Sequence, residues 1–330
     1  MSNTLYPLKF KPVYKTTIWG GNVFKNEMNR TDAPDNCGES WEISGVDGNI
    51  SVVSNGFLAG NNLEELLEIY MGDIVGDCVY ERFGNEFPLL IKFIDADDNL
   101  SVQVHPDDEL AEKRHNSFGK TEMWYVLDHK TGAALINGFS KEISKDEYLE
   151  ALNNKHLSSI LNSMEVNKGD VFFIPAGRVH AIGKGITIAE IQQTSNITYR
   201  IYDFDRVDKN GNSRELHTDL AVDAIDYKIK KDYRSPYKPI LNHTVNTVDC
   251  DYFTTDFIRF NRTIEKDYPE LDSFVIYICT EGSFSITYNE KESVHIYKGE
   301  TVLIPAVLKN LTLTPDMQTD ILEVFVKKSK

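Results

Sequence analysis

Apolar and polar residues alternate most clearly in residues 101–108, Ser-Val-Gln-Val-His-Pro-Asp-Asp. In a strand, the two valines of this stretch point to one side, whereas Ser101, Gln103 and His105 point to the other. A polar row that faces an interior needs hydrogen-bond partners or a bound group. We therefore expect this strand to line a binding site.

Most of the remaining chain also has the pattern of short strands, separated by Gly, Pro, Asn and Asp. This pattern favours a sandwich or barrel over a parallel sheet, so we predict a mostly β fold. Helical spacing is found in residues 63–71 and in a predicted insertion at about 106–116 and 144–163, the latter as two pieces, 144–153 and 157–163. The expected strands are 8–21, 38–44, 87–94, 101–105, 120–127, 170–174, 186–193 and 198–204, followed by further strands after about 240.

An internal repeat indicates two similar barrels. Residues 298–306, Lys-Gly-Glu-Thr-Val-Leu-Ile-Pro-Ala, echo residues 168–176, Lys-Gly-Asp-Val-Phe-Phe-Ile-Pro-Ala. The second copy has no histidine at the position that corresponds to His180. We predict an N-terminal domain, residues 1–235, that contains the site and the helical insertion. Residues 236–330 are predicted to form a degenerate domain without metal ligands.

Composition narrows the classes of partner. With 41% apolar and 26% charged residues, the chain resembles an ordinary globular protein. Its net charge of −16 argues against nucleic acid and against an anionic membrane surface as partners. The four cysteines include no Cys-x-x-Cys pair, and the N-terminal residues have no apolar core of signal-peptide length. We therefore expect a cytoplasmic protein without disulfides.

Four residues form a candidate metal site: Gln103, His105, Glu122 and His180. Imidazole, carboxylate and amide oxygen suit zinc, and also Fe(II), Mn or Ni. Few protein ligands leave room for water or substrate, as in catalytic sites. The alternative is that the two histidines are separate, each satisfied by hydrogen bonds without a shared ion.

The same residues carry a resemblance to a known family. Gly169, Pro175, Gly177 and His180 match the second metal motif of the cupin superfamily. The Gln103-x-His105-Pro-Asp strand, Lys120-x-Glu122 and His180 together resemble type I mannose-6-phosphate isomerases in their short bacterial form. Trp19-Gly-Gly and Gly38-Glu-Ser-Trp-Glu are similar to N-terminal motifs of that family. The resemblance implies two cupin (jelly-roll) barrels and one Zn²⁺ per chain.

The implied reaction interconverts mannose 6-phosphate and fructose 6-phosphate by proton transfer through an enediol(ate). It requires a base, an electrophile and cations for the phosphate. Lys92 interrupts a buried apolar run, and Lys120 shares a strand face with Glu122. In the family, the positions that match Lys92, Ser101 and Lys120 lie around the phosphate, and Lys120 is also a candidate for proton transfer. Alternatively, both lysines are solvated structural residues.

Two further residues are candidates for catalysis. Glu190 is a carboxylate on the strand after the His180 segment and could act as a general base. Arg200 matches the arginine that the family assigns to catalysis, and its guanidinium could steady an enediolate or a phosphate. Their alternatives are a solvated glutamate and a surface ion pair with Asp203 or Asp205.

Two other functions fit the ligand set less completely. A metal-dependent cupin oxidase or dioxygenase would use Fe(II), but Gln103 stands where that group has a histidine. A non-catalytic sugar-binding cupin would not need all four ligands. We expect a sugar-phosphate substrate, and a monomer or weak dimer.

Overall fold

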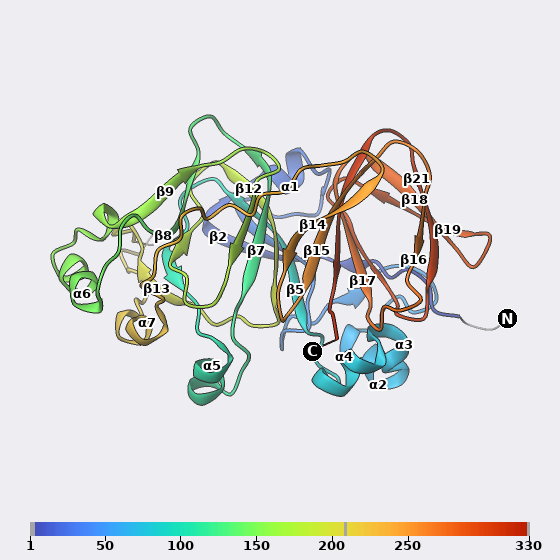
Figure 1. Ribbon diagram of the computed structural model, residues 1–330, viewed down its shortest axis with the longest axis horizontal. Helices are drawn as coiled ribbons and strands as arrows, with labels where there is room; N and C mark the ends of the chain where they lie inside the picture. Colours follow the sequence, from blue (N-terminus) through green and yellow to red (C-terminus); the bar gives the residue numbers. More distant parts are fainter. Residues whose placement is uncertain (1–3, 208–209, 329–330) are drawn as a thin grey trace. The chain divides into compact units, whose positions relative to one another are not determined.

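The computed structural model describes residues 4–207 and 210–328, and the chain in it divides into two compact units (Figure 1). Unit 1 comprises Met1–Val13, Glu42–Leu90 and Pro236–Lys330, and unit 2 comprises Tyr14–Trp41 and Ile91–Ser235. Strands dominate both units, so the predicted mostly β fold is confirmed. Among the described residues, no helix is both long enough and apolar enough to span a bilayer.

Two sheets build unit 2. The larger sheet has six strands in the order β10-β7-β12-β5-β2-β3, and the smaller has five in the order β13-β6-β11-β8-β9. The larger sheet consists of β2 (Val13–Gly21), β3 (Cys37–Ile43), β5 (Leu89–Ala96), β7 (Glu122–His129), β10 (Val171–Ile174) and β12 (Ile186–Gln193). The smaller sheet consists of β6 (Val102–Val104), β8 (Ala134–Phe139), β9 (Leu161–Glu165), β11 (His180–Ala181) and β13 (Tyr199–Tyr202).

Apolar side chains from both sheets meet in one core. Trp124 and Ile188 from the larger sheet pack in the same buried cluster as Leu135 of the smaller sheet. On the other face of the smaller sheet, Val102 and Val104 pack in a second cluster with residues of the surrounding helices. The valines of β6 therefore face away from the shared core, as their alternation with Gln103 predicts.

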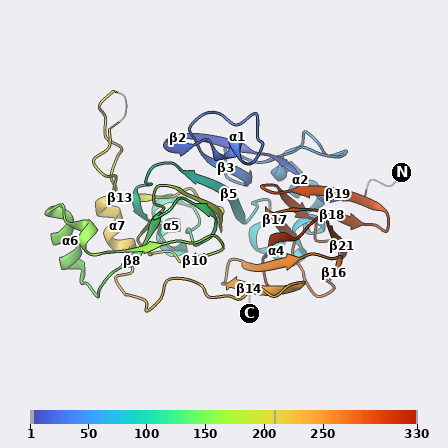
Figure 2. The ribbon, with the colours of Figure 1, turned by 90° about the horizontal axis from the view of Figure 1, so that it is seen from above.

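Helices flank the smaller sheet of unit 2. They are α5 (Asp108–His115), α6 (Lys145–Asn153) and α7 (Thr218–Ala224), and a short α1 (Val23–Asn26) follows β2. Figure 2 shows α6 and α7 on the outer side of this sheet. The predicted helices at 106–116 and 144–153 are confirmed.

The prediction of a helix at residues 157–163 is wrong. One turn of 3-10 helix, η1 (Leu157–Ser159), is followed by β9, which pairs with β8 through Leu161 and Phe139. Apolar residues at 157, 160 and 161 have helical spacing, but the backbone of 161–165 completes the ladder of the smaller sheet instead. Tertiary pairing overrides local periodicity here.

The described residues of unit 1 form two larger sheets, a two-stranded sheet and three helices. Its five-stranded sheet consists of β14 (His243–Asp249), β15 (Thr254–Phe260), β22 (Thr319–Phe325), β17 (Val275–Glu281) and β20 (Thr301–Ile304), in that order. Its four-stranded sheet consists of β16 (Ile264–Asp267), β21 (Asn310–Pro315), β18 (Ser283–Tyr288) and β19 (Glu292–Tyr297). The other elements are β1 (Phe10–Lys11), β4 (Val52–Val53), α2 (Leu63–Tyr70), α3 (Gly72–Val75) and α4 (Asp77–Phe83).

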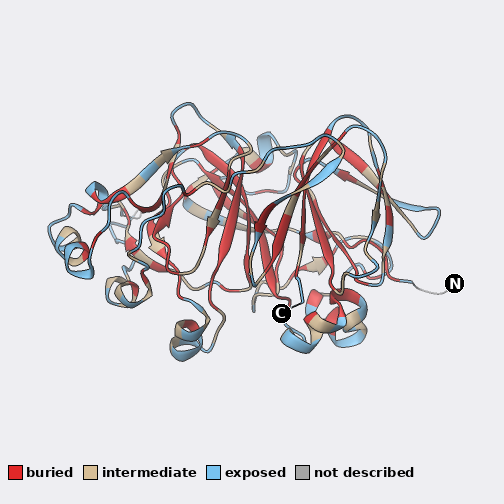
Figure 3. Ribbon diagram, in the orientation of Figure 1, coloured by how far each residue is buried: buried red, intermediate tan, exposed pale blue. Residues whose placement is uncertain are grey.

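Segments far apart in sequence join within unit 1. Leu8 and Leu303 exchange two backbone hydrogen bonds, of 2.8 and 2.9 Å. The capping box of α2, formed by Asn62 and Glu65, fixes the start of the predicted helix at 63–71. Figure 3 shows that inner strands such as β7, β12, β17 and β22 are buried along most of their length, whereas edge strands such as β14 and β19 are largely exposed or half-buried.

Candidate metal centre

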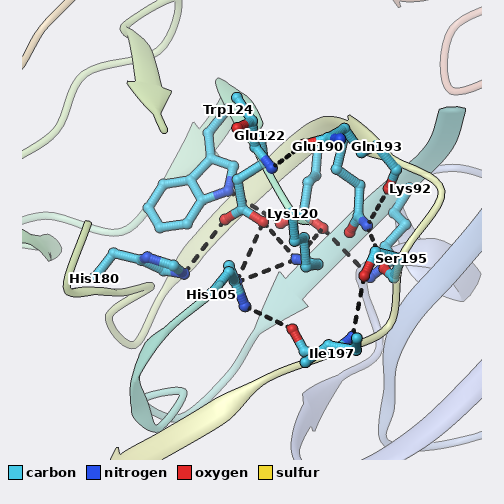
Figure 4. A network of polar contacts seen from close by, with 12 residues as sticks. Lys92, His105, Lys120, Glu122, Trp124, His180, Glu190, Gln193, Ser195 and Ile197 are labelled. Carbon is cyan, nitrogen blue, oxygen red and sulfur yellow. Dashed lines mark hydrogen bonds and ion pairs between the residues drawn. The ribbon is translucent and has the colours of Figure 1, made fainter. Parts of the chain in front are cut away.

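Three predicted ligands converge between the sheets of unit 2. His105 follows β6, Glu122 begins β7, and His180 begins β11. Their ligand atoms all lie within 4.8 Å of one another, and the three side chains are buried (Figure 4). The prediction that these three residues meet is therefore confirmed.

Backbone carbonyls set the tautomer of both histidines. His105 Nδ1 lies 2.9 Å from the carbonyl oxygen of Ile197, and His180 Nδ1 lies 2.8 Å from that of Arg178. Because a carbonyl only accepts, each Nδ1 must carry the proton, and each Nε2 then presents a lone pair. Those Nε2 atoms lie 3.5 Å (His105) and 3.4 Å (His180) from the carboxylate of Glu122.

Burial keeps both imidazoles neutral. It lowers the pKa of His180 to about 3, and burial together with the charge of Lys120 lowers the pKa of His105 well below its ordinary value. His180 Nε2 is buried and has no hydrogen-bond partner in the described part of the chain. Two neutral imidazoles with outward lone pairs beside a carboxylate are a donor set that fits a divalent ion.

Lys120 lies within the same cluster. Its Nζ donates to Glu122 Oε2 at 2.5 Å and lies 3.2 Å from His105 Nε2. The ammonium thus provides a positive charge at the oxygen and nitrogen atoms that would hold a cation. This contact supports the idea that the donor atoms of Glu122 and His105 attract a positive charge.

Strand register places Gln103 and Arg200 on the ligand face. His180 is the cross-strand partner of Gln103, and Gln103 is the partner of Arg200 on the next strand. Directly paired residues project to the same face of a sheet, so the three side chains form one row. Ser101, two positions before Gln103, is buried. The roles of Gln103 as a ligand, of Arg200 in catalysis and of Ser101 in phosphate binding stay predictions.

Arg200 is partly buried at the end of this row. Its Nη1 donates to the carbonyl oxygen of Glu215 at 2.7 Å, and its Nε is buried without a hydrogen-bond partner among the described residues. Burial and the charge of Arg214 lower its pKa. Among the described residues, Asp203 forms its ion pairs with Arg206 and Arg214, and none with Arg200.

A second set of charges lies on the larger sheet beside the ligands. Lys92 Nζ is 3.3 Å from Glu190 and 3.4 Å from Glu39, and Lys120 is 3.9 Å from Glu190. Burial opposes the charge of Lys92, but Glu39 and Glu190 outweigh it and raise the pKa of the lysine. Lys92 and Lys120 are therefore buried and paired, not solvated at the surface.

Glu190 is held in place by an indole. Trp124 Nε1 donates to Glu190 Oε2 at 3.0 Å, and the two residues are cross-strand partners on β7 and β12. Burial and the neighbouring charge of Glu122 raise the pKa of Glu190. A carboxylate whose proton affinity is increased in this way suits a general base better than a solvated one.

Sequence reasoning assigned no role to Glu39 or to Trp41. Trp41 Nε1 donates to Glu39 Oε2 at 2.6 Å, and the Lys92 ammonium lies 4.9 Å from the centre of the Trp41 ring. In the Gly38–Glu42 motif, Glu39 and Trp41 are two positions apart and so share a strand face, which was a signal for a carboxylate beside an indole. The pairing of Glu39 with Lys92 had no such signal in the sequence, because it depends on the order of strands in the sheet.

Relatives with known names match nearly the whole chain. Mannose-6-phosphate isomerase ManA of Bacillus subtilis is 34% identical over 92% of this chain and 94% of its own length. Mannose-6-phosphate isomerase of Streptococcus mutans is 32% identical over 94% of this chain and 96% of its length. A crystal structure of the Bacillus subtilis mannose 6-phosphate isomerase superposes with a TM-score of 0.87 at 31% identity, covering 97% of this chain and 99% of the other.

More distant structures share the fold. The apo form of mannose 6-phosphate isomerase from Salmonella typhimurium superposes with a TM-score of 0.77 at 15% identity, over 98% of this chain. The family described as phosphomannose isomerase type I, catalytic domain, matches residues 7–142, which contain Gln103, His105 and Glu122. The resemblance drawn from the metal motifs is confirmed, and the chain belongs to the type I phosphomannose isomerase family.

Proposed function

We propose that this protein is a zinc-dependent mannose-6-phosphate isomerase. One observation carries the proposal. Two neutral imidazoles, His105 and His180, direct unprotonated Nε2 atoms at the carboxylate of Glu122, in a chain that belongs to the family. Gln103 shares a strand face with His180 and would complete the set of ligands. One zinc ion per chain would bind there.

The residues fit a zinc ion by the chemistry of the donors. Nitrogen and oxygen ligands without sulfur suit a catalytic zinc site, and the buried Nε2 of His180 has no other partner in the described residues. When bound, zinc acts as a Lewis acid that polarises the sugar carbonyl and stabilises developing negative charge. The chain supplies everything else that the isomerisation needs.

Proton transfer is assigned to Glu190. Isomerisation of an aldose to a ketose moves one proton between adjacent carbons, and a single carboxylate can remove it and return it. Trp124 fixes Oε2 of Glu190 by a hydrogen bond, and Lys92 lies 3.3 Å from Oε1. Lys120 is the alternative residue for proton transfer, since its ammonium lies between the carboxylates of Glu122 and Glu190.

Arg200 is assigned to the developing enediolate. Its register beside Gln103 supports this, and a guanidinium stays charged where an ammonium would lose its proton. Binding of the phosphate by Lys92, Ser101 and Lys120, a monomer or weak dimer, and a cytoplasmic location stay predictions.

A coupled assay on mannose 6-phosphate, with zinc measured on the same preparation, tests the proposal. Activity should vanish with EDTA and return with zinc. Oxygen uptake with Fe(II) in place of isomerisation would refute it in favour of an oxidase or dioxygenase. Sugar-phosphate binding without turnover in the zinc-loaded protein would refute it in favour of a binding protein.

A further inference from the structure

His217 binds both backbone groups of Arg200. The N–H of His217 donates to the carbonyl oxygen of Arg200 at 2.7 Å, and the N–H of Arg200 donates to His217 Nδ1 at 3.2 Å. Among the described residues, β13 is an end strand of the smaller sheet, and every second residue of an antiparallel strand directs its N–H and C=O away from the neighbouring strand. For Arg200 these outward groups are both satisfied by one residue, 17 positions later in the chain.

The hydrogen bond from Arg200 fixes the tautomer of the His217 ring. Because a backbone N–H only donates, Nδ1 of His217 must present a lone pair. The ring proton then lies on Nε2, which is 3.9 Å from the carboxylate of Glu215. His105 and His180 have the opposite tautomer, with the proton on Nδ1 and Nε2 left for a metal ion. His217 therefore serves as an acceptor for the backbone and not as a metal ligand.

The same segment also holds the side chain of Arg200. Nη1 donates to the carbonyl oxygen of Glu215 at 2.7 Å, so residues 215–217 contact Arg200 at three points, and we call them the Arg200 clamp. Helix α7 begins directly after the clamp, and its Ala221 is buried in the cluster that also contains Val104 of β6. The packed helix thus anchors one end of the clamp on the smaller sheet.

The clamp leaves one edge of the Arg200 guanidinium without a partner. Nε is buried and has no hydrogen-bond partner in residues 4–207 and 210–328, and Nη2 donates to no residue there either. Nε and Nη2 form a planar fork of donors, which matches two neighbouring oxygen atoms. An enediolate has two such oxygens, on adjacent carbons. Strand register places Arg200 beside Gln103 and, one strand further, His180, so this fork belongs to the row that contains the candidate metal centre.

We propose that His217 is a positioning residue for the isomerisation and acts through Arg200. Its two hydrogen bonds fix the backbone of Arg200, and the Glu215 carbonyl fixes the rotation of the guanidinium, so that the fork of Nε and Nη2 is held toward the enediolate. The role in the reaction rests on the proposed function, whereas the clamp rests only on the contacts given above. A group misplaced by about 1 Å can cost a reaction about 10²-fold in rate, so a clamp of this kind has a measurable effect.

Steady-state kinetics of the zinc-loaded full chain on mannose 6-phosphate test the positioning role. His217→Leu removes the acceptor and should lower kcat by about 10–10²-fold with a smaller change in KM, because Arg200 is assigned to the transition state. His217→Asn should restore most of the activity, since Oδ1 of asparagine accepts a hydrogen bond at about the position of Nδ1. His156→Leu is the matched control: it makes the same substitution at an exposed histidine of unit 2 and should behave as the wild type does.

A double-mutant cycle separates positioning of Arg200 from an independent role of His217. In an Arg200→Ala background, assayed at high enzyme concentration, His217→Leu should change kcat by less than about twofold, because there is no guanidinium left to position. If the losses of the two single variants multiply instead, His217 acts by another route and the proposal is overturned. If His217→Leu does not fold, His217→Gln takes its place in every measurement, since it moves the acceptor one bond further from the backbone.

Hydrogen exchange of the Arg200 backbone amide tests the clamp without any need for turnover. This amide should exchange at least about tenfold faster in His217→Leu than in the wild type, because its acceptor is gone, and His217→Asn should keep most of the protection. Zinc content should be the same in all three proteins. Unchanged exchange in His217→Leu would overturn the clamp, and loss of zinc from this variant would overturn an action through Arg200 alone.

The two measurements distinguish the clamp from the proposed function. If His217→Leu speeds the exchange of the Arg200 amide but the zinc-loaded wild type does not isomerise mannose 6-phosphate, the proposed function fails and the clamp stands. If the wild type isomerises the sugar phosphate and His217→Leu keeps its kcat, the positioning role fails and the proposed function stands.

Discussion

Replacing Lys120 with methionine should destabilise the zinc-free protein and strengthen its dependence on zinc. The side chains of Lys120 and Glu122 are 6% and 1% exposed, and their charged atoms lie 2.5 Å apart. Methionine keeps the length of the side chain but leaves Glu122 as a buried carboxylate without its cation. Breaking one partner of such a buried pair costs about 3–5 kcal/mol.

The zinc-loaded form should respond differently. A divalent ion at His105, Glu122 and His180 would neutralise the carboxylate in place of the ammonium. It would also be repelled by that ammonium at close range. Zinc should therefore restore most of the stability lost in Lys120→Met, and the variant should bind zinc at least as tightly as the wild type.

Urea unfolding followed by tryptophan fluorescence measures this effect in the right part of the chain. All three tryptophans, Trp19, Trp41 and Trp124, belong to unit 2. With a denaturant slope of about 2–3 kcal/mol per M, a loss of about 3–5 kcal/mol should lower the zinc-free midpoint by about 1–2.5 M. Saturating zinc should close most of the gap.

Lys130→Met is the matched control. Its ammonium lies 2.8 Å from Asp97, but the two side chains are 68% and 56% exposed. Such an exposed pair contributes only about 0.2–1 kcal/mol, with or without zinc. If Lys120→Met is as stable as Lys130→Met without zinc, or binds zinc more weakly than the wild type, the competition of Lys120 with a metal ion is refuted.

Three further predictions concern catalysis, metal binding and the loop that joins the ligand segments. Glu190→Gln should retain zinc but lower kcat by about 10²–10⁴-fold. Burial raises the pKa of Glu190, and a general base must be deprotonated to act. As the pH decreases, kcat/KM of the wild type should therefore begin to fall at a higher pH than it would for a carboxylate with an ordinary pKa. A fall of kcat/KM only near the ordinary pKa of a glutamate would contradict this. Arg200→Ala should lose turnover but keep its zinc, whereas His105→Ala should lose both turnover and zinc. Equal loss of zinc in the two variants, measured by metal analysis, would contradict the separate roles of Arg200 and His105. Gly177 has a φ of +84°, and an added Cβ would lie 2.9 Å from the carbonyl oxygen of Ala224. Gly177→Ala should therefore cost about 1–2 kcal/mol in urea unfolding, and zinc affinity should fall with it, because the Gly177 N–H binds the His105 carbonyl.

The cluster of His105, Glu122 and His180 could be predicted from sequence because the placement of these residues depends on local rules. Alternation in β6 fixes the faces of Gln103 and His105, and the two valines that alternate with them, Val102 and Val104, pack on the other face of the sheet. Glu122 and His180 belong to motifs whose spacing is characteristic. Each of these inferences needs only a few neighbouring residues.

The charge network around Glu190 could not be predicted in this way. Lys92 meets Glu190 because β5 lies beside β12, and it meets Glu39 because β3, which is far away in the sequence, also pairs with β5. Residues 157–163 show the same limit, since their pairing with β8 depends on a strand more than twenty positions away.

The interleaved order of the two units has a consequence for synthesis on the ribosome. Every segment of unit 2 has been made once Ser235 is added, so this unit can fold while the chain still grows. Residues 42–90 emerge earlier but lack the strands after residue 236, and Leu63, Leu66 and Leu67, buried in the finished fold, must wait uncovered. At about 5–20 residues per second, the 240 residues from position 90 to position 330 take about 12 to 48 s, a window in which chaperones can bind that segment.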